Sequence, residues 1–151
     1  MKLFNLLFIL MITNFCNAQI HINTLNNVFE DNPKPIIIYF FTDWCTVCKL
    51  QKNEIKKTLF SKQNIENEVY FLQLNGESKE NITFLGQTFQ SNSTDKNNNL
   101  HDFILNFEDP NQINFPFCVI LTKDLEIIGK YNGLIKDDIL IKLMNGIDIV
   151  N

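Results

Sequence analysis

The chain has 151 residues, of which 45% are hydrophobic and 20% charged, and it contains only 5 glycines and 4 prolines. These values describe a globular protein with room for one domain, and they exclude collagen-like, low-complexity and wholly disordered chains. The formal net charge is −4 and all 13 basic residues are lysines. Because arginine supplies most of the bidentate contacts to phosphates and bases, we do not expect nucleic-acid binding.

Residues 1–18 have the three parts of a secretory signal peptide. Lys2 supplies a positive start, residues 3–12 are apolar except for one asparagine, and the small residues of 16–18 precede a cleavage site before Gln19. The apolar run is too short to span a bilayer, which takes about 20 residues. We therefore predict a periplasmic or secreted protein with no stable membrane insertion after the signal is removed.

Two alternatives for this segment remain open. One is a buried N-terminal helix. The other is a lipid-anchored N-terminus at Cys16, although the bulky Phe15 before it is unusual for lipidation. The predicted mature domain, 19–151, is large enough to form a core without disulfide staples, so its cysteines are not expected to be a structural framework.

The hydrophobic pattern of the mature chain predicts helices and strands in the order of one α/β domain. A short helix is expected at 25–31, and the continuous apolar run 36–41 is typical of a strand covered on both faces. The further predicted elements are a helix at 45–60, a strand at 69–74, a short helix at 82–89, a surface loop at 90–99, one or two helical turns at 100–107, strands at 117–122 and 126–131, and an amphipathic helix at 137–144.

Two connections constrain the sheet that these strands form. A long helical crossover joins strands 36–41 and 69–74, which are therefore expected to be parallel. A tight turn joins strands 117–122 and 126–131, which predicts an antiparallel hairpin. The sheet should therefore be mixed.

One motif indicates chemistry: Cys45 and Cys48 form a C-x-x-C pair where a buried strand meets a helix. This spacing brings two sulfurs close enough for a disulfide. The first cysteine lies at the helix N-terminus, where unpaired N–H groups and the helix dipole stabilise a thiolate. Lowering a thiol pKa from about 8.5 to about 7 takes roughly 2 kcal/mol, which this geometry can supply. The second sulfur, deeper in the first turn, is placed to attack a mixed disulfide.

The same spacing also occurs in zinc sites and in structural disulfides. A zinc site usually needs four ligands, and only Cys118, His21 and His101 remain as candidates in the mature chain. We favour the redox interpretation and predict no metal, with a metal-handling protein as one alternative. A binding module whose disulfide never turns over is the other.

The segment 39–49 resembles the active-site segment of thioredoxin-fold proteins, and is most similar to the C-terminal periplasmic thioredoxin domain of the DsbD thiol:disulfide interchange family. Further similarity lies at 57–61, 72–75, Phe115-Pro116 and 129–133, and is interrupted by the polar stretch 86–114. The resemblance implies a thioredoxin fold, with a central mixed β-sheet of about four strands flanked by helices on both faces. It also implies an exported thiol–disulfide oxidoreductase without a cofactor.

The resemblance assigns roles to five residues. Cys45 and Cys48 would be the catalytic cysteines and form the redox-active disulfide. Pro116 would follow a cis peptide bond, so that the backbone of Phe115 pairs with an extended substrate strand. Trp44 would be an exposed apolar platform beside the sulfur. The expected partners are disulfide-containing client proteins and an unidentified redox partner protein. An ordinary trans proline and a core tryptophan are the alternatives.

Two residues depart from the family pattern. Thioredoxins bury an acid six residues before the first cysteine, and here that position is Tyr39; the lysine that partners the acid is matched by Gln73. Because both members of the ion pair are absent, no unpaired charge is buried. The family's general-base mechanism is therefore in doubt, and water or Asp43 would have to accept the proton.

Two further residues could contribute chemistry. Cys118, two residues beyond Pro116 in an apolar strand, is expected to be a small buried hydrophobe with a free thiol. A third redox sulfur is the alternative. His101 lies in the polar stretch and is expected at the surface.

Overall fold

The computed structural model describes residues 22–61, 69–91, 99–136, 138, 139 and 142. The predicted signal peptide 1–18 lies outside them. Within these residues, none of the helices has the length and hydropathy needed to cross a membrane.

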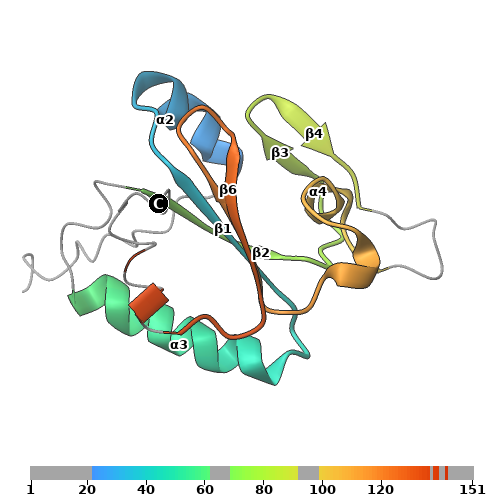
Figure 1. The fold of residues 1–151 in the computed structure, drawn as a ribbon. Coiled ribbons are helices and arrows are strands. Elements are labelled where there is room, and N and C mark those ends of the chain that lie inside the picture. The colour runs from blue at the N-terminus through green and yellow to red at the C-terminus, as the bar shows by residue number, and fades with distance from the viewer. Residues whose placement is uncertain (1–21, 62–68, 92–98, 137, 140–141, 143–151) are drawn as a thin grey trace, which may run out of the picture.

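A four-stranded mixed sheet forms the centre of the fold, as predicted (Figure 1). The strands are β1 (Ile36–Phe41), β2 (Tyr70–Asn75), β5 (Phe117–Leu121) and β6 (Ile127–Asn132), in the order β2-β1-β5-β6. β1 is parallel to β2 and antiparallel to β5, which in turn is antiparallel to β6. The two central strands are almost wholly buried, which explains why both are uninterrupted apolar runs.

Alternate residues of the strands face two separate cores. On one face, Ile37, Tyr39 and Cys118 pack with Ile55 of helix α3 (Thr46–Ser61). On the other face, the strands pack against η1 (Ile22–Thr24), α2 (Leu25–Asp31) and α4 (Asp102–Leu105). Figure 1 shows α3 running along one side of the sheet and α2 and α4 on the opposite side. The period of two along each strand thus creates both layers.

The prediction of a helix at 82–89 was wrong. This segment is a hairpin of β3 (Ile82–Phe84) and β4 (Gln87–Phe89). Its two turn residues, Leu85 and Gly86, have φ values of 47° and 81°, the left-handed conformation that two-residue hairpin turns require. The rings of Phe84 and Phe89 lie 5.1 and 5.0 Å from that of Phe103. Packing on α4, which local periodicity does not reveal, therefore favours the hairpin.

The other predicted elements are found within a residue or two of their expected bounds, as far as they are described. α4 confirms the helical turns expected at 100–107 and is followed by η3 (Pro110–Gln112). Most of the predicted loop 90–99 lies outside the described residues. Of the predicted helix 137–144, only positions 138, 139 and 142 are described, and all three are helical.

Candidate active site

The turn between β1 and α3 places Cys45 immediately before the first helical residue. The Cys45 N–H donates to the Thr42 carbonyl oxygen at 3.2 Å, and the Cys45 carbonyl oxygen accepts the N–H of Lys49 at 3.3 Å. Cys45 therefore occupies the N-cap position of α3, whose first N–H groups have no partner within the helix.

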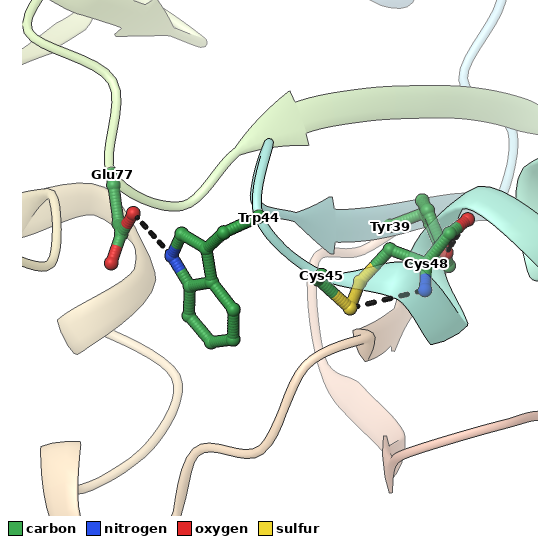
Figure 2. Close-up of a disulfide and its surroundings, with 5 residues drawn as sticks. All are labelled: Tyr39, Trp44, Cys45, Cys48 and Glu77. Carbon is green, nitrogen blue, oxygen red and sulfur yellow. Dashed lines mark hydrogen bonds between the residues drawn. A yellow bond between two sulfur atoms is a disulfide. The ribbon is translucent and has the colours of Figure 1, made fainter.

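A disulfide joins Cys45 and Cys48, whose Cα atoms are 5.2 Å apart. The Cys48 N–H donates to the Cys45 Sγ at 3.0 Å, as Figure 2 shows. After reduction, the same N–H and the positive end of the helix dipole would stabilise a Cys45 thiolate. Cys45 is 5% exposed and Cys48 3%, so helix position, rather than burial, distinguishes the two sulfurs.

Trp44 forms an exposed platform next to the disulfide. Its side chain is 66% exposed, which agrees with the predicted platform and not with a core tryptophan. The indole N–H donates to Glu77 Oε2 at 2.9 Å, and Figure 2 shows the ring directed toward Glu77. The ring of Phe115 meets the indole edge-on, with centroids 6.2 Å apart.

The peptide bond between Phe115 and Pro116 is cis, as the resemblance implied. The Pro116 carbonyl oxygen accepts the N–H of Gly133 at 2.7 Å. Through its contact with Trp44, Phe115 lies beside the active-site turn. The structure thus brings together the residues proposed from the sequence to bind substrate, and that binding role stays a prediction.

Sequence reasoning missed the turn after β2, which holds the Asp43-Trp44 segment. Asn75 Nδ2 donates to Asp43 Oδ2 at 3.1 Å, and Asn75 Oδ1 accepts the N–H of Glu77 at 2.9 Å. At Gly76, a Cβ would come within 2.7 Å of the Phe115 ring. The only local signal is an Asn-Gly pair ending a strand, a common turn sequence that indicates nothing about its distant partners.

Tyr39 lies buried beneath the pair, in the family's acid position. Its hydroxyl donates to the Cys48 carbonyl oxygen at 3.3 Å, so it supports the helix rather than a proton path. Burial raises the pKa of Tyr39, and Cys118 adds to the shift. Gln73 pairs with Tyr39 in the register of β1 and β2. No buried acid therefore occupies either position.

Cys118 is a free, buried cysteine opposite Tyr39 in the register of β1 and β5. Burial raises the pKa of its thiol to about 12, which keeps it protonated and unreactive at neutral pH. The structure therefore agrees with the expected small hydrophobe.

The prediction that His101 lies at the surface was wrong, because it is 1% exposed. Its Nδ1 accepts the N–H of Phe103 and caps α4, at 3.0 Å, while its Nε2 lies 3.0 Å from the Glu80 carbonyl oxygen. With Nδ1 an acceptor, Nε2 carries the proton and donates. Burial lowers the pKa of His101, although the Glu80 carbonyl opposes this shift. Both ring nitrogens are thus used in the fold.

A mixed sheet with strand order β2-β1-β5-β6, a C-x-x-C disulfide at the N-terminus of α3 and a cis-proline before β5 define a thioredoxin-like protein. The chain belongs to the thioredoxin-like domain family, whose sequence profile matches residues 23–147. No curated protein is a significant match.

Two solved structures illustrate the likeness of fold. Chloroplastic thioredoxin z is 14% identical, with 84% of this chain and 89% of that chain covered and a TM-score of 0.51. The exposed lipoprotein thioredoxin of Streptococcus pneumoniae is also 14% identical, with 78% and 88% covered and a TM-score of 0.51. At these identities the likeness concerns the fold alone.

Proposed function

We propose that this protein is an exported thiol–disulfide oxidoreductase that reduces or exchanges disulfides in extracytoplasmic proteins. The observation that carries the proposal is the hydrogen bond from the Cys48 N–H to the Cys45 Sγ at the N-terminus of α3. A sulfur at a helix N-terminus with an N–H donor has the environment that lowers thiol pKa values. Family membership supports the same activity.

The reduction runs in two exchange steps. The Cys45 thiolate attacks a client disulfide, forms a mixed disulfide and releases one client sulfur as a thiolate, which takes a proton from water. Cys48 then loses its proton and attacks the Cys45 Sγ, which forms the Cys45–Cys48 bond and releases the second client sulfur. Two electrons pass from the cysteine pair to the client, and oxidation of a dithiol client is the reverse.

Substrate binding is assigned to Trp44, Phe115 and Pro116. The indole of Trp44, the residue before Cys45, presents an exposed apolar surface against the Phe115 ring, and the Phe115 backbone is proposed to pair with an extended client strand. Main-chain pairing of this kind tolerates many client sequences.

Export by the segment 1–18 supplies the proposed location, in the periplasm or outside the cell, with lipid anchoring at Cys16 as the alternative. In such an oxidising compartment a thiol pair must be kept reduced by a partner, so a redox partner protein belongs to the proposal. The similarity of segment 39–49 to the DsbD domain supports membership of that subfamily as part of the proposal. A metal-handling function is less favoured, since the ring nitrogens of His101 and the buried Cys118 are committed to the fold.

Turnover of insulin disulfides with dithiothreitol as the electron source tests the function. Wild type should accelerate insulin precipitation, Cys45→Ser should abolish the acceleration, and Cys48→Ser should trap mixed disulfides through Cys45. Cys118→Ala is the matched control and should keep full activity. Alkylation of the reduced protein near neutral pH should label Cys45 first. Folded wild type without turnover would refute the proposal, and first labelling of Cys48 would reverse the two roles.

A further inference from the structure

A small cavity opens beside Cys48 at the start of α3. Its volume is about 160 Å³ and its walls are formed by Phe41, Thr42, Asp43, Cys48, Lys49 and Lys52. The Thr42 hydroxyl, in a residue that is 1% exposed, has no hydrogen-bond partner within the described part of the chain. An unpaired buried hydroxyl at the wall of a cavity of this size favours bound water.

Lys52 is held at this cavity by contacts of its own. It follows Cys48 by four residues on α3, so both side chains lie on one face of the helix. Its ammonium lies 5.1 Å from the centroid of the Phe41 ring, a cation–π contact. Lys52 is half-buried, whereas Lys49 is exposed. The position of the Lys52 charge is therefore more restricted than that of an ordinary surface lysine.

The second exchange step needs a Cys48 thiolate, and among the described residues no acid lies beneath the disulfide to accept its proton. Tyr39 is buried there, and its hydroxyl donates to the Cys48 carbonyl oxygen. In the described part of the chain, the other ionisable groups that line the cavity with Cys48 are Lys49, Lys52 and Asp43. One Asp43 carboxylate oxygen accepts a hydrogen bond from Asn75. Cys118 lies beyond Tyr39 on the neighbouring strand.

We propose that Lys52 stabilises the Cys48 thiolate across this cavity, and that the proton of Cys48 leaves through cavity water instead of through a buried acid. This inference rests on the proposed oxidoreductase function. The Cys48 S–H bond breaks with its electron pair kept on sulfur, and water carries the proton to solvent. The thiolate then attacks the Cys45 Sγ as described above. Lys52 acts only through its charge and takes no proton.

The test measures resolution of a mixed disulfide on Cys45. Stopped-flow reaction of the reduced protein with dithiodipyridine, an uncharged reagent, gives a first release of thiopyridone as Cys45 is modified. The second release, independent of reagent concentration, reports attack by Cys48. The variants are Lys52→Gln, Lys52→Arg and Lys57→Gln, the last removing the same charge from α3 further from the cavity.

We expect Lys52→Gln to raise the pH midpoint of the second release by about half to one unit. A less stable thiolate is also more nucleophilic, with a Brønsted coefficient of about 0.4–0.5. Resolution should therefore be only about two- to threefold slower at pH 7, and equal or faster on the alkaline plateau. Lys52→Arg and Lys57→Gln should keep the wild-type profile. At about 1 M salt, where the Debye length is about 3 Å, the difference should shrink.

Slower resolution by Lys52→Gln at every pH, or equal slowing by Lys52→Arg, would indicate a packing role and overturn the inference. An unchanged midpoint in Lys52→Gln would overturn it as well. The assay needs no protein client, so it separates the two proposals: absent insulin turnover with a shifted midpoint would refute only the oxidoreductase function. Insulin turnover with an unchanged midpoint would refute only the role of Lys52.

Discussion

Replacing Tyr39 by aspartate restores the acid that thioredoxins bury beneath their disulfide, but without its lysine partner. Tyr39 is fully buried, between the rings of Phe41 and Phe71, with centroids 6.5 and 6.4 Å away. The Gln73 side chain beside it carries no charge. We expect Tyr39→Asp to be strongly destabilised at pH 7, because a buried carboxylate is left without a counterion.

The pH dependence separates the charge from the lost ring. Burial raises the pKa of such a carboxyl above its unfolded value of about 3.9, so the folded chain binds the proton more tightly. The contribution of this carboxyl to stability is therefore largest below about pH 4 and falls as the pH rises through the folded pKa. Staying protonated up to pH 7 costs about 4 kcal/mol, which is the ceiling for the charge effect. Tyr39→Asn is the matched control, because it removes the ring as Tyr39→Asp does but introduces no charge.

Tyr39→Phe removes only the hydroxyl. The hydrogen bond from this hydroxyl to the Cys48 carbonyl oxygen is 3.3 Å long. A hydrogen bond contributes about 0.5–1.5 kcal/mol to stability, so the free energy of unfolding should fall by an amount near the lower value. Disulfide exchange should stay within a few-fold of wild type, because a neutral tyrosine is not a base at pH 7.

Urea unfolding from pH 4 to pH 8, together with exchange rates, measures all three variants. Tyr39→Asp and Tyr39→Asn should be equally stable near pH 4 and diverge as the pH rises. Parallel curves would refute the reasoning, since they would mean that an acid at this position is solvated or paired. A large rate loss in Tyr39→Phe at unchanged stability would mean that the hydroxyl takes part in the chemistry.

Two other substitutions test contacts that only the structure reveals. Gly76→Ala places a Cβ 2.7 Å from the Phe115 ring. The substitution should therefore lower the free energy of unfolding in urea by about 1–3 kcal/mol and change the fluorescence of the neighbouring Trp44. No change in either measurement would mean that the ring moves aside freely. Burial lowers the pKa of His101. The contribution of this neutral imidazole to folding stability is therefore complete above about pH 6.5 and is lost as the pH falls through the folded pKa. His101→Asn, which can keep the cap, should lose less stability between pH 7 and pH 5 than wild type, and equal losses would contradict a buried neutral imidazole.

Much of the fold follows from patterns that are local in the sequence. The run 36–41 is apolar at every position, and such a strand is stable only between two covered faces, so its central place was predictable. The position of Cys45 at a helix end was equally predictable, since the chain changes there from a buried strand to amphipathic periodicity. The predicted helix at 82–89 failed because two φ values and a distant phenylalanine decide that segment.

The sequence by itself thus determined the thioredoxin-like order of elements, the cysteine pair and its place at a helix N-terminus. Only the tertiary structure decided which polar groups surround that pair. Asn75 and Glu77 hold the active-site turn across more than thirty residues of sequence, and His101 is buried because a backbone carbonyl and an N–H are brought to its two nitrogens. Hydrogen-bond partners of this kind depend on how separate segments pack together, and no periodicity in the chain encodes them.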